Sequence, residues 1–174
     1  MTTAQPAVLL EHYLKQLKLP TILREYARLA AVCTQDRRGF ATYLLRLAEL
    51  EVIEREHRAA ERRVKAAGFP VLKTLDTFDF AAQPSINQAL VRELIGGDYI
   101  QNRENVLVVG NSGTGKTHLA CALAFAACAQ GRRVRSFTVT GLVTQLLERR
   151  EERSLEKAQR QLERMDLLVL DELG

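Results

Sequence analysis

The stretch Gly110-Asn111-Ser112-Gly113-Thr114-Gly115-Lys116-Thr117 decides the fold of this chain. It fits the Walker A pattern G-x-x-x-x-G-K-[ST] without a mismatch. A short apolar run, Val106–Val109, precedes it and a longer one, Leu119–Ala129, follows it, so we predict a strand, a phosphate-binding loop and a helix in that order. Glycines let such a loop curl until successive backbone N–H groups face a phosphate, and the helix N-terminus adds about half a positive charge.

The side chains at the end of this motif indicate a nucleotide site. Lys116 can reach the β- and γ-phosphates as a point charge, and the Thr117 hydroxyl can ligate Mg²⁺. A glycine-rich turn without a ligand is the less favoured alternative. His118 lies on the first helical turn, where we expect packing on the helix surface rather than catalysis. The predicted nucleotide-binding residues are Gly110, Asn111, Ser112, Gly113, Thr114, Gly115, Lys116, Thr117 and His118.

A second motif follows near the end of the sequence. Four apolar residues, Leu167–Leu170, lead into Asp171 and Glu172, which is typical of a Walker B strand. A buried strand holds an unpaired carboxylate only at high cost, so we place Asp171 at the carboxyl edge, where Mg²⁺ would offset its charge. Glu172 is the predicted general base for an attacking water, and Lys116 is the second predicted catalytic residue. The predicted metal ligands are Thr117 and Asp171.

The first part of the chain has helical patterns. Leucines recur at helical spacing over residues 10–17, Pro20 interrupts the pattern, and a second stripe starts at Leu23. A longer helix is predicted from Phe40 to Lys65, ended by Gly68 and a following proline. Its polar face is predicted to be supported by i,i+4 ion pairs, namely Glu51–Arg55, Glu54–Arg58 and Glu61–Lys65.

Beyond residue 104 the pattern alternates between strands and helices. Val134–Val139 is rich in Val, Thr and Phe, residues 142–165 read as an interrupted helix, and Leu167–Leu170 forms a third strand. We therefore predict a βαβαβ order and an α/β fold: a parallel P-loop NTPase sheet with helices on both faces, preceded by a small all-helical domain. The predicted segments are 1–70 (helical, binding DNA or a partner), 71–104 (linker and short helix) and 105–174 (partial ATPase domain).

Composition excludes several other classes of protein. With 174 residues, 47% of them hydrophobic and 26% charged, the chain is neither disordered, collagen-like nor a disulfide framework. Its three cysteines form no CxxC, and we expect Cys121 and Cys128 to be small buried residues. The longest apolar run has 11 residues, about half of what a membrane span needs, and residues 1–6 lack a secretory signal. We expect a cytoplasmic protein without a membrane partner.

Charge is unevenly distributed along the chain. Residues 1–75 carry 13 basic and 8 acidic side chains, whereas residues 76–174 carry 12 and 13. The basic excess suggests a polyanionic partner such as DNA, and a merely solvated helical surface is the open alternative. The candidate DNA contacts are Arg37, Arg38, Arg58, Arg62, Arg63 and Lys65.

Two stretches resemble a known family. Gly115-Lys116-Thr117-His118-Leu119-Ala120 and the closing Asp166-Leu-Leu-Val-Leu-Asp-Glu-Leu-Gly174 are similar to IstB-type transposition helper ATPases, relatives of DnaC-type helicase loaders in the AAA+ class. The resemblance extends to the N-terminal helices, Phe78-Asp79-Phe80 and Gln83-Pro84-Ser85. It implies an ATPase that uses ATP and Mg²⁺, assembles as an oligomer on double-stranded DNA and assists a transposase in choosing a target.

The same resemblance implies parts beyond Glu172 that this sequence does not contain: a sensor-1 residue, an arginine finger and a sensor-2 helix. The family's sensor-1 strand lies between the two Walker strands, so two inner strand edges would be left unpaired. We therefore expect a truncated chain of a longer protein, without fast hydrolysis of its own.

Other functions are compatible with the same nucleotide-binding loop. A helicase loader would bind single-stranded DNA and a replicative helicase. A non-catalytic module would bind ATP to assemble and barely hydrolyse it. An ABC-type or small-molecule kinase function is less favoured, because the sequence has no ABC signature and no acceptor-specific site.

Overall fold

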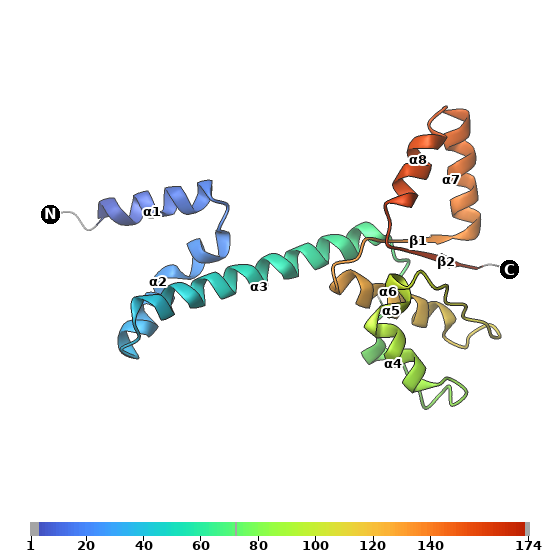
Figure 1. Cartoon of the computed structure of the whole chain (residues 1–174), viewed down its shortest axis with the longest axis horizontal. Coiled ribbons are helices and arrows are strands. Elements are labelled where there is room, and N and C mark those ends of the chain that lie inside the picture. The colour runs from blue at the N-terminus through green and yellow to red at the C-terminus, as the bar shows by residue number, and fades with distance from the viewer. Residues whose placement is uncertain (1–3, 72, 173–174) are drawn as a thin grey trace. The chain divides into compact units, whose positions relative to one another are not determined.

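A computed structural model describes residues 4–71 and 73–172 of the chain (Figure 1). The chain divides into two compact units, residues 1–59 and residues 60–174. The boundary between them falls within one helix, α3 (Phe40–Ala67). The predicted division of the chain at residues 70 and 104 stays a prediction.

The first unit consists of helices, as predicted. They are α1 (Ala4–Gln16), α2 (Pro20–Gln35) and the first part of α3. Pro20 is the first residue of α2, a position where its missing N–H removes no helical hydrogen bond. Leu14, Leu29 and Leu47, one from each helix, are buried and form the core of the unit.

A buried carboxylate ties α2 to α3. Glu51 is only 4% exposed. Its Oε2 accepts hydrogen bonds from the backbone N–H groups of Thr21 (2.8 Å) and Ile22 (3.1 Å), which a helix start leaves without partners. The predicted ion pair with Arg55 is present at 3.6 Å, and Arg58 adds a second at 3.4 Å. Burial raises the pKa of Glu51, but the backbone hydrogen bonds and the Arg55 charge outweigh it and lower the pKa overall.

The second unit begins with the end of α3, after which Gly68 takes a left-handed φ of +74°. The elements that follow are the 3₁₀ turn η1 (Leu75–Thr77), α4 (Gln88–Gly96), α5 (Asp98–Gln101), α6 (Lys116–Ala129), β1 (Val134–Thr138), α7 (Val139–Glu151), α8 (Leu155–Glu163) and β2 (Leu167–Asp171). The helix predicted over residues 142–165 is interrupted, as expected, at the turn between α7 and α8.

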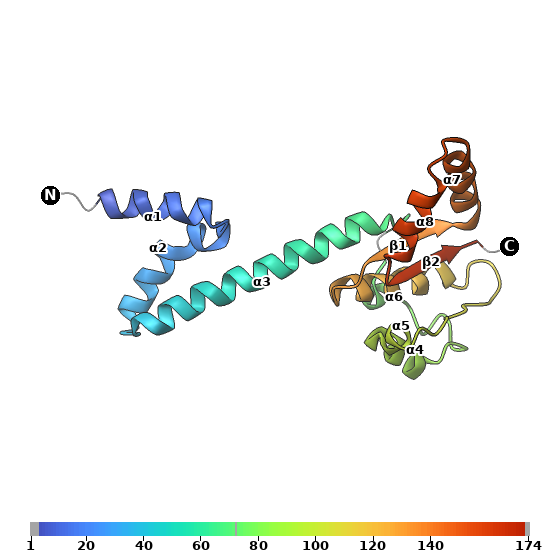
Figure 2. The same cartoon turned by 45° about the horizontal axis from the view of Figure 1, so that its top comes forward.

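The two strands form a parallel sheet, with Val134 opposite Leu167 and Thr138 opposite Asp171. Helix α6 lies against one face of this sheet, and the α7–α8 hairpin lies on the other (Figure 2). Ala127 and Cys128 of α6 pack on Val134 in a core that excludes water. The α/β class, the parallel pairing and the helices on both faces therefore agree with the sequence pattern.

The segment Val106–Val109, predicted as the first strand, is not a strand. Within residues 4–71 and 73–172, no strand pairs with it through backbone hydrogen bonds. Leu107 and Val109 are 77% and 92% exposed. A strand needs a neighbour to satisfy its N–H and C=O groups, so apolar character alone does not create one. The predicted βαβαβ order is wrong at this position.

The described helices were also compared with the requirements of a membrane span. None of them, in residues 4–71 and 73–172, is both long and apolar enough to cross a bilayer.

Candidate functional site

The glycine-rich loop lies between α5 and the start of α6, and its backbone shape depends on two glycines. Gly113 and Gly115 have φ angles of +78° and +86°, in the left-handed region that side chains disfavour. Gly115 is the N-cap of α6. A Cβ on Gly115 would lie 2.8 Å from the ring of Phe78, so the position excludes alanine on two independent grounds. The loop thus ends with free N–H groups at a helix N-terminus, as an anion site requires.

Two side chains of the loop converge on one carbonyl group. The Lys116 ammonium donates to the backbone oxygen of Asn111 at 2.7 Å, and the Thr114 hydroxyl donates to the same oxygen at 2.8 Å. These bonds hold the ammonium over the loop rather than out in solvent. The predicted cationic partner for phosphate therefore lies beside the backbone N–H groups that it would complement.

The two Walker motifs meet through a side-chain hydrogen bond. The Thr117 hydroxyl donates to Asp171 Oδ2 at 2.8 Å, although 54 positions separate the two residues. Oxygen ligands next to each other in a Mg²⁺ octahedron lie about 2.9 Å apart, because each is 2.0–2.1 Å from the ion. The hydroxyl of Thr117 and the carboxylate of Asp171 both offer oxygen atoms, which Mg²⁺ prefers as ligands. The distance between these two oxygens matches one edge of that octahedron. The predicted ligands Thr117 and Asp171 therefore fit this ion.

Glu172 follows at the carboxyl end of β2 with an exposed side chain. Its backbone has a left-handed φ of 60°, and its N–H donates to Asp171 Oδ1 at 3.0 Å. This bond occupies the second oxygen of Asp171 and holds the carboxylate in place. The predicted base role of Glu172 stays a prediction.

The His118 side chain contacts the η1 turn and Phe78. Its Nε2 lies 2.9 Å from the Thr74 carbonyl oxygen and 3.2 Å from the Thr77 hydroxyl. Its ring meets the Phe78 ring edge-on, with centroids 5.0 Å apart. The packing role expected for His118 agrees with these contacts, and its assignment to nucleotide binding stays a prediction.

The segment around Phe78 forms the support of the loop. Phe78, Val91 and Leu119 make a buried cluster that joins η1, α4 and α6. Phe78 also packs edge-on against Phe80, with ring centroids 4.8 Å apart. The sequence signal was the Phe78-Asp79-Phe80 pattern, which marked the resemblance but did not show what the rings contact.

The two cysteines of α6 are buried. Cys121 and Cys128 are 3% and 0% exposed, which confirms the prediction that they are small core residues. Burial raises the pKa of the Cys121 thiol, and the nearby charge of Asp171 raises it further. Both effects favour the unreactive thiol.

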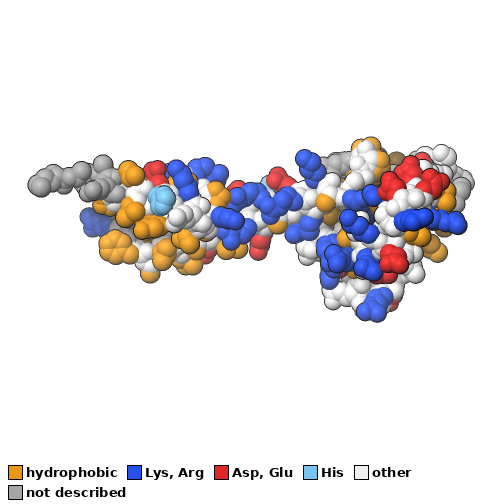
Figure 3. All heavy atoms as spheres, turned by 90° about the horizontal axis from the view of Figure 1, so that it is seen from above, with side chains coloured by type: hydrophobic (Ala, Val, Ile, Leu, Met, Phe, Trp, Pro, Cys, Tyr) orange, Lys and Arg blue, Asp and Glu red, His pale blue; other side chains and the backbone are white. Residues whose placement is uncertain are grey.

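The candidate DNA contacts separate into two groups. Arg58 and Arg63 are used within the protein, since Arg58 contacts Glu51 and the Arg63 Nε donates to the Cys128 carbonyl at 2.8 Å. The other four are exposed, and among the described residues no hydrogen bond or ion pair involves their side chains: Arg37, Arg38, Arg62 and Lys65. Lys and Arg side chains gather along α3 in the view of Figure 3.

Comparison with known proteins shows the family of the chain. The model of a family described as "IstB-like ATP binding protein" matches residues 12–174. The chain belongs to this family. The IstB-like chain is 34% identical over 165 residues to a Geobacillus stearothermophilus protein named as an ATP-binding protein of insertion sequence IS5376. This alignment covers 95% of the chain and 66% of that relative.

Two further relatives have similar names. A Pseudomonas aeruginosa protein named for ATP binding in insertion sequence IS21 is 35% identical, with 95% of this chain and 62% of the relative covered. An insertion-sequence protein of Sinorhizobium fredii, also named for ATP binding, is 38% identical, with 92% and 54% covered. The IstB-like chain therefore spans between 54% and 66% of the length of these three relatives.

Proposed function

We propose that this IstB-like protein binds ATP with Mg²⁺ at the Gly110–Thr117 loop and acts as an ATPase that assists DNA transposition. The observation that carries the proposal is the 2.8 Å bond between Thr117 and Asp171. It brings a hydroxyl and a carboxylate together at the mouth of a loop with two left-handed glycines and a lysine. Few arrangements other than a nucleotide site use this combination.

Each residue has a distinct task in this proposal. The N–H groups at the start of α6 and the Lys116 ammonium neutralise the phosphates. Thr117 and Asp171 would hold Mg²⁺, which supplies positive charge next to the phosphate oxygens. Glu172 would accept a proton from the attacking water, because its exposed carboxylate follows directly after Asp171.

The role in transposition rests on family membership and on charge. The relatives are named for insertion sequences. The exposed basic side chains Arg37, Arg38, Arg62 and Lys65 offer contacts for the phosphates of double-stranded DNA. We propose that ATP-bound copies assemble on such DNA and engage the transposase of the same element.

The unpaired segment Val106–Val109 bears on hydrolysis. Its exposed apolar side chains have no strand partner within residues 4–71 and 73–172, so no neighbouring strand holds the start of the loop in place. Hydrolysis by this chain alone is then expected to be slow.

Single-turnover hydrolysis with excess protein and radiolabelled ATP tests the catalytic part of the proposal. The wild-type chain should release phosphate faster than Glu172→Gln at the same ATP occupancy. Equal rates would reduce the function to ATP-dependent assembly.

Pull-down on a DNA duplex tests the partner: recovery of a replicative helicase in place of the transposase would identify a helicase loader.

A further inference from the structure

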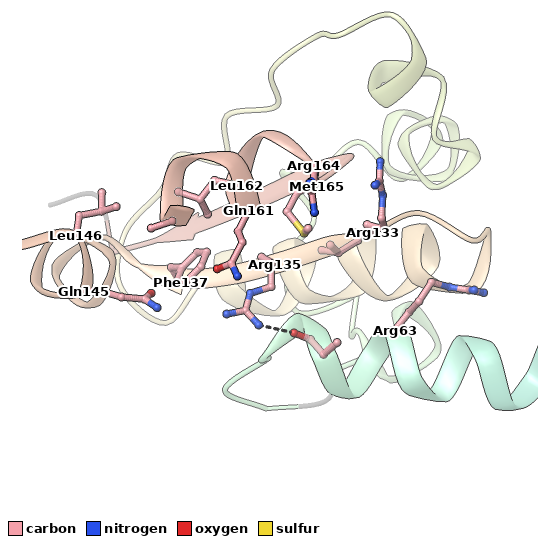
Figure 4. A pocket seen from close by; sticks show the side chains of 13 residues that line it. Arg63, Arg133, Arg135, Phe137, Gln145, Leu146, Gln161, Leu162, Arg164 and Met165 are labelled. Carbon is pink, nitrogen blue, oxygen red and sulfur yellow. Dashed lines mark hydrogen bonds between the residues drawn. The ribbon is translucent and has the colours of Figure 1, made fainter. Parts of the chain in front are cut away.

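A cavity of about 430 Å³ lies in the second unit, away from the glycine-rich loop. It is open on one side and is lined by the last turns of α3, by β1 and by the α7–α8 hairpin (Figure 4). Part of its lining is apolar, with Phe137, Leu146, Leu162 and Met165, and Gln145 and Gln161 lie beside them. Nothing in the proposed ATP chemistry uses this cavity.

Arginine side chains are the charged part of the lining. They are Arg63, Arg133, Arg135 and Arg164, and none of the lining residues is an aspartate or glutamate. The positive charge of Arg133 is neutralised by Asp166, which does not line the cavity and lies 3.1 Å from the guanidinium. Hydrogen bonds from the side chain and backbone of Arg133 lower the pKa of Asp166, which keeps this pair ionised.

The other guanidinium groups keep their net charge. Arg135 donates to the Ala66 carbonyl at 2.9 Å and lies 5.4 Å from the centre of the Phe137 ring, so carbonyl and ring hold it without neutralising it. Arg63 is held in the same way by the Cys128 carbonyl. Among the described residues, Arg164 has no side-chain hydrogen bond or ion pair. Arg135 is therefore held beside Phe137, where it can meet an external anion, whereas the Arg63 side chain points away from Phe137 and Leu162 (Figure 4).

We propose that this cavity binds an acidic segment of a protein partner, which inserts one bulky apolar side chain between Phe137 and Leu162 and places carboxylates on the arginines. Carboxylates match the planar fork of a guanidinium, and apolar anchors surrounded by charged pairs are the usual pattern of a peptide-binding pocket. A phosphodiester backbone would pair with the arginines but leave the apolar part of the lining, at Phe137 and Leu162, without a partner. The cavity therefore favours a peptide over nucleic acid.

The test uses the full chain and three fluorescein-labelled peptides in anisotropy titrations. The first peptide has the sequence Glu-Asp-Leu-Phe-Glu-Asp, the second replaces Leu-Phe by Ser-Ser, and the third replaces all acids by their amides. The first peptide should bind saturably, and both others should bind at least about tenfold more weakly. Absence of saturable binding of the first peptide up to about 1 mM, or equal binding of all three, overturns the proposal.

Charge reversal locates the site. Arg164→Glu should lower the affinity for the first peptide about tenfold, because an attractive contact becomes repulsive. Lys157→Glu is the matched control: Lys157 is exposed on α8, does not line the cavity, and its reversal should leave the affinity unchanged. Far-UV circular dichroism checks that both variants fold. If Arg164→Glu weakens the binding of a fluorescent DNA duplex but leaves the binding of the peptide unchanged, the cavity is a nucleic-acid site and the proposal is wrong.

Discussion

The hydroxyl of Thr117 and the carboxylate of Asp171 lie 2.8 Å apart, and their bond joins the first turn of α6 to the last residue of β2. Thr138, the register partner of Asp171 on β1, ends its strand at the same edge. The carboxyl edge of the sheet and the helix N-terminus therefore form one site.

Removing the ammonium group from the loop should weaken nucleotide binding without unfolding the protein. In Lys116→Ala we expect ATP affinity to fall by about 10- to 150-fold, the range for loss of a charge-assisted hydrogen bond. The fold should persist, because among the described residues the Lys116 side chain bonds only to the Asn111 carbonyl within its own loop. Isothermal calorimetry measures the affinity, and Lys157→Ala, on exposed α8, is the control. Unchanged ATP affinity in Lys116→Ala would remove the lysine from the site.

Neutralising the Walker B aspartate should act through the metal ion. Asp171→Asn keeps an oxygen that can accept from Thr117 but loses the charge that attracts Mg²⁺. We expect ATP affinity in EDTA to stay as in wild type, and the gain in affinity on adding Mg²⁺ to shrink about tenfold. Titration of a fluorescent ATP analogue with and without Mg²⁺ measures both quantities. A variant that responds to Mg²⁺ like the wild type would show that Asp171 is not a ligand.

The shape of the glycine-rich loop and the place of Asp171 at the end of β2 could be predicted, because both depend on residue types that are neighbours in the sequence. Glycines at positions 113 and 115 are required by backbone angles that few other residues adopt. Asp171 could be placed at the carboxyl edge because a charge is costly inside a strand. These constraints are local, so a single sequence reveals them.

Three features could not be predicted, because each depends on a partner distant in sequence. The contact of His118 with Thr74 uses a backbone carbonyl, which leaves no signal in residue types. Glu51 lies on the polar side of a helical pattern, yet the start of α2 covers it. Val106–Val109 has the composition of a strand, but strand formation requires a neighbour as well.

The imidazole of His118 should stabilise the segment that supports the loop. In His118→Ala the contacts to Thr74, Thr77 and Phe78 are lost, which should cost about 1–2 kcal/mol locally. We expect faster hydrogen exchange over residues 74–80 and a smaller loss of ATP affinity than in Lys116→Ala. Mass spectrometry resolves the exchange by segment, with the exposed His12→Ala as control. Unaltered exchange combined with lost hydrolysis would instead give His118 a chemical role.

The buried carboxylate of Glu51 should make the first unit sensitive to acid. Its folded pKa is lowered, so its contribution to stability is complete above the unfolded pKa of about 4.3 and disappears as pH falls through the lower folded value. At pH 7, Glu51→Gln should reduce the free energy of unfolding by about 1–3 kcal/mol, because one acceptor and the charge facing Arg55 and Arg58 are lost. Below the folded pKa the wild type and the variant should converge, since a protonated carboxyl resembles an amide.

Urea denaturation followed by tyrosine fluorescence measures this effect in the unit concerned. The chain has four tyrosines and no tryptophan, and in a Tyr99→Phe background the three that remain all lie within residues 1–59. Glu56→Gln, a change at an exposed position of the same helix, should leave the pH profile as in wild type. A constant difference between wild type and Glu51→Gln from pH 7 to pH 3 would show that the carboxylate charge does not contribute, and that only shape or hydrogen bonding at this position matters.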